Sequence, residues 1–321
     1  MQLAGRVALV AGATRGAGRG IARALGEAGA IVYCTGRSSR SAPPEPRRPE
    51  TIEETAELVT AAGGAGIAVR CDHSDEAAVR RLFERVRAEH GRLDVLVNDI
   101  WGGDALAEWG TPFWRADLAR GLGMLDPCDG SGGVVVEVTD GAFHGYRGQL
   151  FYDLCKASVI RLAYAMAVEL EGHPVTALAI TPGFLRSEAV LDHFGVTEAN
   201  WRDAIAKDPH FAHSETPLLV GRAIAALAAD PDVRRHAGRV LTCWEVTRRY
   251  GVRDVDGRQP HWDEHLDEAV GEILARDAPS ADELSVLRMR RSQLDFDAAR
   301  REQRARIDAF LRRHGGDAPA G

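Results

Sequence analysis

A tyrosine and a lysine stand four positions apart in the segment Tyr152-Asp153-Leu154-Cys155-Lys156. On a helix this spacing places both side chains on one face. A phenol, with a usual pKa of about 10, exchanges its proton poorly at neutral pH, and a neighbouring ammonium lowers that pKa by favouring the phenolate. The pair is therefore suited to proton exchange with a carbonyl or alcohol oxygen.

The composition of the chain supports this interpretation. Among 40 Lys and Arg residues, only Lys156 and Lys207 are lysines. Lysine and arginine are not interchangeable beside a reacting phenol. The alternative is a tyrosine packed on a helix beside a solvated lysine, but the placement of one of two lysines favours catalysis.

A glycine-rich turn lies near the start of the chain, in Gly12-Ala13-Thr14-Arg15-Gly16-Ala17-Gly18. It follows an apolar run and opens an alanine-rich helical pattern. Glycines permit a tight turn and close backbone approach, and a helix N-terminus offers N–H groups to a diphosphate. A flexible loop is the alternative, which this placement disfavours. The turn predicts a dinucleotide cofactor.

Charge after the second apolar run indicates which dinucleotide binds. An acid there would accept a hydrogen bond from a free ribose 2′-hydroxyl. The sequence instead has Thr35-Gly36-Arg37-Ser38, and Arg15 stands in the glycine turn. Two guanidinium groups suit a 2′-phosphate, which favours NADP(H) over NAD(H). Solvated surface arginines are the alternative.

Short apolar runs alternate with helical patterns along the chain. This alternation predicts an α/β fold with a Rossmann-type doubly wound parallel sheet in three α/β/α layers. The expected strands are 7–11, 30–35, 67–71, 93–98, 134–139, 175–181 and 239–243, and the expected helices are 21–28, 52–62, 77–89, 113–125 and 150–171.

The composition changes near residue 251 to charged helix. Leu266, Val270, Ile273 and Leu274 would share one helical face, and Ser280 with Glu283 would form a capping box. We expect a Rossmann domain over residues 1–250 and a C-terminal helical arm over 251–321. The arm either covers exposed surface or forms a solvated tail.

The glycine spacing and the Tyr152–Lys156 pair resemble the short-chain dehydrogenase/reductase (SDR) family over residues 4–245, especially its branch of SDR family member 1-like proteins. The resemblance implies that Tyr152 is the acid/base, that Lys156 lowers its pKa and anchors the nicotinamide ribose, and that Thr139 orients the carbonyl. Thr139 lies thirteen positions before Tyr152 (152 − 139 = 13), where the family usually has serine. Threonine keeps the hydroxyl.

The same resemblance assigns further cofactor contacts. Asp72 matches an adenine-contacting aspartate and Asn98 a cofactor-side asparagine. Pro182 and Gly183 match a segment over the nicotinamide, and Ser187 stands where a threonine commonly contacts the carboxamide. Ordinary strand-end turns are the alternative for each of these positions.

The sequence also departs from the family. Of the Asn-Asn-Ala-Gly stretch, only the first position remains in Asn98-Asp99-Ile100-Trp101, and no asparagine occurs between Asn98 and Asn200. The helix that carries the catalytic asparagine and builds the usual dimer has no clear counterpart; residues 113–125 are the candidate. The helix-bundle dimer is therefore not expected, although another homo-oligomer remains compatible.

Two functions stay open. The first is an NADP(H)-dependent oxidoreductase that reduces a carbonyl or oxidises a secondary alcohol of a small molecule. Leu191, Phe194 and Trp201 in a lid over 184–211, with Trp101 and Phe143, suggest an apolar or aromatic substrate, although plain core packing is the alternative. The second is an NADP(H)-binding sensor or scaffold without turnover.

Composition excludes other classes. The net charge is -7 with no basic stripe, so nucleic acid is not an expected partner. No apolar run approaches the ~20 residues of a membrane span, and no secretory signal is recognisable, so we expect a cytoplasmic protein. Five scattered cysteines indicate reduced, buried thiols and no metal site.

Overall fold

The computed structural model describes residues 2–42, 48–100, 133–141, 149–275 and 286–287. Several predictions of the sequence fall outside these ranges: the helix at 113–125, the Ser280–Glu283 capping box, and the side chains of Trp101, Cys128 and Phe143. The other four cysteines, Cys34, Cys71, Cys155 and Cys243, are free and buried.

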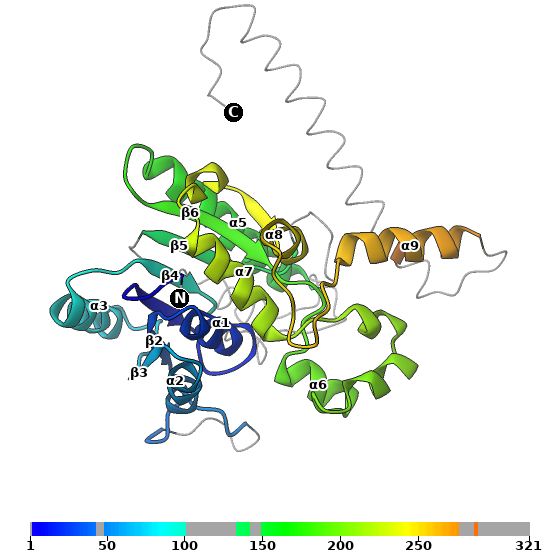
Figure 1. The fold of residues 1–321 in the computed structure, drawn as a ribbon, viewed down its shortest axis with the longest axis horizontal. Coiled ribbons are helices and arrows are strands. Elements are labelled where there is room, and N and C mark those ends of the chain that lie inside the picture. Colours follow the sequence, from blue (N-terminus) through cyan, green and yellow to red (C-terminus); the bar gives the residue numbers. More distant parts are fainter. Residues whose placement is uncertain (1, 43–47, 101–132, 142–148, 276–285, 288–321) are drawn as a thin grey trace, which may run out of the picture. The chain divides into compact units, whose positions relative to one another are not determined.

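The described core is a seven-stranded parallel sheet in the order β3-β2-β1-β4-β5-β6-β7, which confirms the Rossmann-type α/β prediction (Figure 1). Its strands are β1 (Val7–Ala11), β2 (Ile31–Gly36), β3 (Ala65–Arg70), β4 (Val95–Asn98), β5 (Val134–Val138), β6 (Thr176–Thr181) and β7 (Val240–Thr242). All five residues of β1 and of β5 are buried, as expected for strands covered on both faces.

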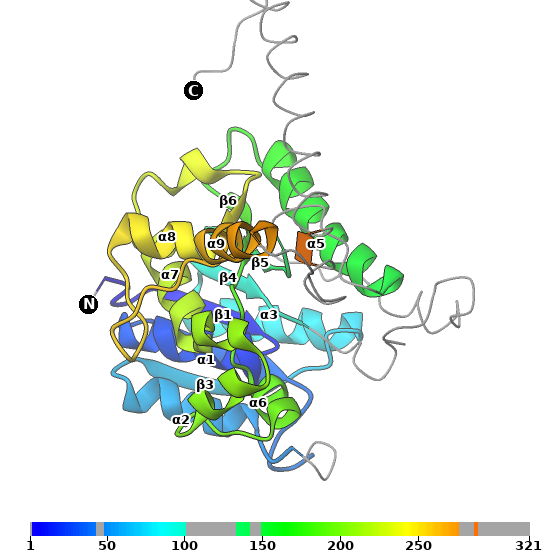
Figure 2. The same ribbon diagram turned by 90° about the vertical axis from the view of Figure 1, so that its right-hand side faces the viewer.

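Helices cover both faces of the sheet and complete the three layers (Figures 1 and 2). One face packs against α1 (Gly16–Glu27), α2 (Ile52–Ala61), α7 (Pro217–Ala229) and α8 (Cys243–Tyr250). The other packs against α3 (Glu76–His90) and α5 (Leu150–Glu169). The short helix α6 (Glu188–Phe194) follows β6.

Helices α1 and α7 pack closely because glycines face each other. A Cβ on Gly20 would lie 2.3 Å from the carbonyl oxygen of Pro217, and one on Gly221 would lie 2.7 Å from the carbonyl oxygen of Gly20. No side chain fits at either position without moving backbone. This contact fixes α1, and with it the glycine turn that precedes the helix.

The sheet brings the predicted site residues to one edge. In a parallel sheet the carboxyl ends of the strands meet at the same edge, and ligands bind where the strand order reverses. Here the order reverses between β1 and β4, because β2 and β3 lie on one side of β1 and the later strands on the other. The glycine turn follows β1, Asp99 follows β4 and Thr139 follows β5.

The chain divides into two compact units. The first contains residues 1–142 and 148–262, and helix α9 (Trp262–Leu274) belongs to the second from Asp263 onward. Residues 251–262 are held in the first unit: the Asp254 carboxylate accepts from Thr216 N at 2.9 Å, and Arg258 donates to Ala212 O at 2.8 Å. The division into residues 1–250 and an arm over 251–321 stays a prediction. In the described ranges no helix has both the length and the apolarity to cross a membrane.

Candidate active site

Tyr152 and Lys156 lie in the first turns of α5. The helix begins at Leu150 because Gln149 caps it, with Oε1 accepting from Tyr152 N at 2.5 Å. The Lys156 ammonium lies 5.7 Å from the centre of the Tyr152 ring. The phenol and the cation therefore share one helix face, within the range of a cation–π contact.

The end of β5 contacts this helix through two side chains. Buried Thr139 donates from Oγ1 to Lys156 O at 2.9 Å, so its hydroxyl is engaged with the backbone of α5. The Tyr152 phenol donates to Asp140 Oδ2 at 2.6 Å. The sequence analysis missed this contact, because nothing local pairs Asp140 with a residue twelve positions later.

The glycine turn leaves no space for side chains. Gly12 has φ +86°, and a Cβ there would lie 2.2 Å from Asp99 O; a Cβ on Gly18 would lie 2.3 Å from Gly12 O. Gly12 N and Ala13 N both donate to Thr35 O, which holds the turn against the end of β2. The turn can pack this closely against itself and against Asp99 only because Gly12 and Gly18 have no side chain.

The N-terminus of α1 already binds an anionic group. Gly16 N donates to Glu188 Oε2 at 2.7 Å, although 172 positions separate the two residues. Arg15, the N-cap residue, provides no side-chain cap. A helix N-terminus binds carboxylates and phosphates by the same N–H groups and dipole. The turn thus presents an N–H that donates to an anion, which fits the diphosphate of a dinucleotide.

Glu188 should therefore compete with the cofactor. We expect Glu188→Gln to bind NADPH roughly fivefold more tightly, because removing a charge-assisted contact at a helix N-terminus changes the free energy by about 1 kcal/mol. Fluorescence titration measures the dissociation constant. Asp192→Asn, which removes a carboxylate from the same helix at a side chain 69% exposed, is the matched control. Unchanged or weaker binding by the Glu188 variant would contradict this interpretation.

Two acids lie beneath the site, half-buried Asp99 and buried Glu137. Burial raises the pKa of Asp99 to about 7, against the opposing influence of the Lys156 charge and a hydrogen bond from Gly18 N. Burial likewise raises the pKa of Glu137 to about 7, and Asn98 Nδ2 donates to its Oε2 at 3.0 Å. Asp99 thus connects the glycine turn with the Tyr152–Lys156 pair. The cofactor-side role of Asn98 stays a prediction.

The residues predicted to bind the adenine end of the cofactor differ in burial and in their hydrogen bonds. Thr14 is buried, Arg15 is half-buried and Arg37 is exposed. Neither guanidinium donates a hydrogen bond within the described part of the chain. Asp72 accepts from Ser74 N at 3.1 Å and from Ser74 Oγ at 2.7 Å, and these bonds lower its pKa. Asp72 thus closes a turn here, and its contact with adenine stays a prediction.

The segment Pro182 to Ser187 returns to the glycine turn from β6. The Gly183 N–H donates to the fully buried carboxyl of Glu215, and a Cβ on Gly183 would lie 2.8 Å from Glu215 Oε2. Ser187 caps α6, and its Cβ would lie 3.9 Å from a Cβ on Gly16. The structure thus places Ser187 beside the turn.

Glu215 makes stability depend on pH. Burial raises its pKa to about 7 from an ordinary value near 4.5. A folded-state pKa above the unfolded one gives stability that is complete at low pH and is lost as the pH rises through about 7. We expect the free energy of unfolding to fall between pH 5 and pH 7 by up to about 1.4 kcal/mol per pH unit from this group.

Replacing Glu215 by glutamine should make that dependence shallower, since the amide does not titrate whereas Asp99 and Glu137 still do. Urea unfolding at several pH values measures it. Glu198→Gln removes an acid whose side chain is 46% exposed and serves as the comparison. An equally steep dependence in the Glu215 variant would contradict the assignment.

The aromatic residues after β6 pack on one another. Trp201 and Phe211 are buried, with Phe184, Leu191 and Phe194 against them. Fully buried Arg186 stacks 4.2 Å from the Trp201 ring and pairs with Glu198 at 2.8 Å. Leu191, Phe194 and Trp201 thus pack into a small core of their own. This agrees with the core-packing alternative to a lid over an apolar substrate.

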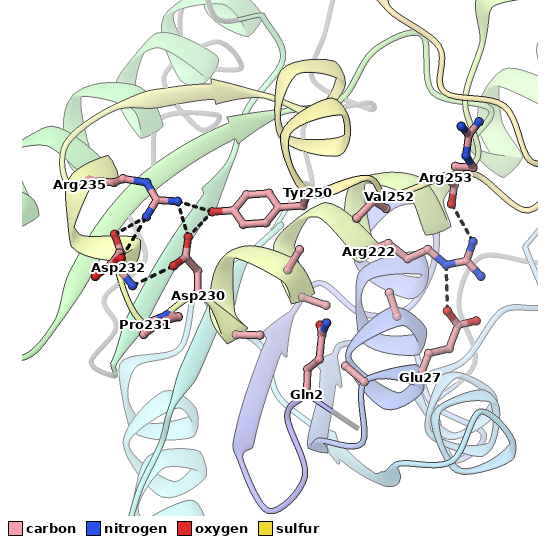
Figure 3. A pocket seen from close by; sticks show the side chains of 15 residues that line it. Gln2, Glu27, Arg222, Asp230, Pro231, Asp232, Arg235, Tyr250, Val252 and Arg253 are labelled. Atoms are coloured by element: carbon pink, nitrogen blue, oxygen red, sulfur yellow. Dashed lines mark hydrogen bonds and ion pairs between the residues drawn. The ribbon is translucent and has the colours of Figure 1, made fainter.

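A hollow at the opposite edge of the sheet is not the cofactor site. It is lined by the C-terminal parts of α1 and α7 and by Asp230, Arg235 and Tyr250 (Figure 3). Its arginines are already paired, Arg222 with Glu27 at 3.0 Å and Arg235 with Asp230 at 2.5 Å. It lies where the strands begin, whereas Tyr152 lies where they end.

Comparisons with known proteins agree with this geometry. Residues 6–100 match the family model described as short chain dehydrogenase. The chain is 36% identical over 276 residues to human dehydrogenase/reductase SDR family member 1, covering 79% of this chain and 84% of that protein. The chain belongs to the short-chain dehydrogenase/reductase family. It is thus a member of the SDR family of oxidoreductases, as its glycine turn and its Tyr152–Lys156 pair predicted.

Solved SDR structures share the fold. A short chain dehydrogenase from Mycobacterium thermoresistibile superposes with a TM-score of 0.65 at 21% identity, over 81% of this chain and 92% of the other. The angucycline C-6 ketoreductase with bound NADP gives 0.59 at 23% identity, over 75% and 95%.

Proposed function

We propose that this SDR protein is an NADP(H)-dependent oxidoreductase that reduces the carbonyl, or oxidises the secondary alcohol, of a small molecule. The observation that carries the proposal is the position of the Tyr152 phenol. It lies beside an ammonium at the sheet edge where the N-terminus of α1 binds a carboxylate. A proton donor and an anion cradle at one edge are what reduction by a dinucleotide requires.

The residues around the glycine turn fit NADP(H). Gly12, Thr14, Gly16 and Gly18 would hold the diphosphate, and Arg15 and Arg37 would bind the 2′-phosphate. Asp72 would contact adenine, Asn98 and Lys156 the ribose side, and Pro182, Gly183 and Ser187 the nicotinamide. A Cβ on Gly12 or Gly18 would clash with backbone, and the contact with Glu188 shows that Gly16 N donates to an anion. When bound, NADPH supplies the hydride.

The protein's own side chains then handle the proton. The Tyr152 hydroxyl donates its proton to the carbonyl oxygen as negative charge develops there. The Lys156 ammonium stabilises the resulting phenolate. Thr139 would orient the carbonyl once its hydroxyl turns from Lys156 O toward substrate.

Arg37 should set the preference for NADP(H). We expect Arg37→Ala to weaken NADPH binding about tenfold and leave NADH binding unchanged, because a lost charged hydrogen bond costs about 1.5 kcal/mol. Arg40→Ala is the matched control, since exposed Arg40 pairs with Glu57 at 2.8 Å. Dissociation constants for both cofactors decide the matter. If Arg37→Ala weakened NADH and NADPH binding equally, Arg37 would not bind the 2′-phosphate.

The experiment that tests the proposal is a titration followed by a turnover assay. NADPH binding is measured by fluorescence, and NADPH absorbance is then followed with aldehydes, ketones and quinones. We expect tight binding and oxidation with at least one carbonyl class. Tight binding without oxidation across the panel would favour the sensor or scaffold instead.

An apolar or aromatic substrate stays a prediction of the sequence, as do a cytoplasmic location and the absence of nucleic acid and membrane partners. Leu191, Phe194 and Trp201 no longer support the apolar preference, because they pack on one another. Helix α5 exposes Leu154, Tyr164 and Val168. Such a face is compatible with a homo-oligomer, whose state size-exclusion chromatography with light scattering measures.

A further inference from the structure

Asp140 contacts the reacting atom of Tyr152 directly. The phenol oxygen and Asp140 Oδ2 are 2.6 Å apart, the separation typical of a hydroxyl donating to a carboxylate. Two further bonds fix the residues on either side of Asp140. Thr139 donates to Lys156 O at 2.9 Å, and Gly141 N donates to Thr181 Oγ1 at 2.8 Å. The carboxylate is therefore held against the phenol.

Two opposite charges act on the phenol. A cation favours the phenolate, whereas an accepting carboxylate favours the neutral phenol. The Lys156 ammonium lies 5.7 Å from the centre of the ring, whereas the Asp140 carboxylate accepts the phenol's own hydrogen. The hydrogen bond to the carboxylate acts directly on the reacting O–H and favours the neutral phenol. The proton thus rests on Tyr152 until substrate arrives.

We propose that Asp140 is a further catalytic residue, which keeps Tyr152 protonated and ready to donate in carbonyl reduction, and which returns its proton afterwards. This inference rests on the proposed function. In each turnover the O–H bond of Tyr152 breaks and the O–H bond of the product alcohol forms. The phenolate then regains a proton from water through the half-buried Asp140 carboxyl. One solvent proton is consumed, and the cofactor supplies the two electrons.

The charged groups that contact Tyr152, or lie next to it or to Lys156, come from three elements in the described ranges. Asp140 follows β5, Asp153 and Lys156 lie on α5, and Asp99 follows β4 and interacts with Lys156. Asp153→Asn is the matched control for Asp140→Asn, because it removes the same charge from the residue next to Tyr152.

The test is a titration of Tyr152 itself. The ultraviolet absorption of the phenolate is followed against pH in wild type, Asp140→Asn and Asp153→Asn, each with and without Tyr152→Phe, so that the difference isolates Tyr152. We expect Tyr152 in Asp140→Asn to lose its proton about one pH unit or more below wild type, and the control to move much less. If the pKa of Tyr152 in Asp140→Asn is the same as in wild type or higher, the proposal is overturned.

A turnover arm separates this inference from the proposed function. Asp140→Asn should lower kcat for reduction at least tenfold at neutral pH, with KM for NADPH unchanged, and Asp140→Glu should restore part of it. Full turnover in Tyr152→Phe would overturn the proposed function, whatever Asp140 does. Turnover that needs Tyr152, with no change in titration for Asp140→Asn, overturns only the inference. Circular dichroism establishes that each variant is folded, and Asp140→Ser replaces Asp140→Asn if that variant fails to fold.

Discussion

Tyr152→Phe should lower the rate of carbonyl reduction by about two to four powers of ten, the usual contribution of a positioned general acid. The substitution removes only the hydroxyl that donates to Asp140 at 2.6 Å and leaves the ring beside Lys156. NADPH binding should remain within about threefold of wild type, since the phenol does not hold the diphosphate. Steady-state kinetics and fluorescence titration measure the two effects separately.

Tyr164→Phe is the matched control for that substitution. Tyr164 lies on the same helix, is 47% exposed and stacks with Arg161. Its variant should keep the wild-type rate. A Tyr152 variant that turned over as fast as this control would show that the proton comes from another group.

Gly18→Ala should abolish measurable NADPH binding. The added methyl would lie 2.3 Å from Gly12 O and 3.0 Å from Asp99 Oδ2, so the turn and the start of α1 must separate. The nearer neighbour is backbone, and the Gly16 N–H, which donates to the Glu188 carboxylate, would be displaced with it. We expect the dissociation constant to rise by at least a hundredfold.

Gly91→Ala separates that steric effect from the general cost of replacing a glycine. Gly91 caps α3 with φ +67° and has nothing within 4 Å of its Cβ position. Its variant should lose about 1–2 kcal/mol of stability through backbone strain and bind NADPH normally. If Gly18→Ala bound as well as Gly91→Ala, the cofactor would not use this turn.

The strand pattern of the sheet was predictable from sequence because most of its strands are short apolar runs buried on both faces. The expected strand at 7–11 agrees with β1 at both ends, and the expected strand at 134–139 differs from β5 by one residue. Helix α7 was not predicted. It is mostly buried, so it lacks the alternating apolar and polar face from which an amphipathic helix is recognised.

The candidate site was predictable where its residues are close in sequence. The spacing of Tyr152 and Lys156 alone places both on one helix face. Glu188 at the glycine turn, Asp140 at the phenol and Glu215 behind Gly183 were missed, because each contact joins residues far apart in the chain. The only signal for these contacts is an acid that the fold buries away from any local partner. That burial becomes known only from the structure, so the sequence alone does not reveal the contacts.

The most direct test of the central claim is a crystal structure of the protein with NADP⁺ and a carbonyl-bearing inhibitor. The account predicts that the diphosphate displaces Glu188 from Gly16 N, and that the inhibitor's carbonyl oxygen lies about 3 Å from Tyr152 Oη with the nicotinamide ring beside it. A cofactor bound away from the glycine turn, or a nicotinamide ring directed away from Tyr152, would contradict it.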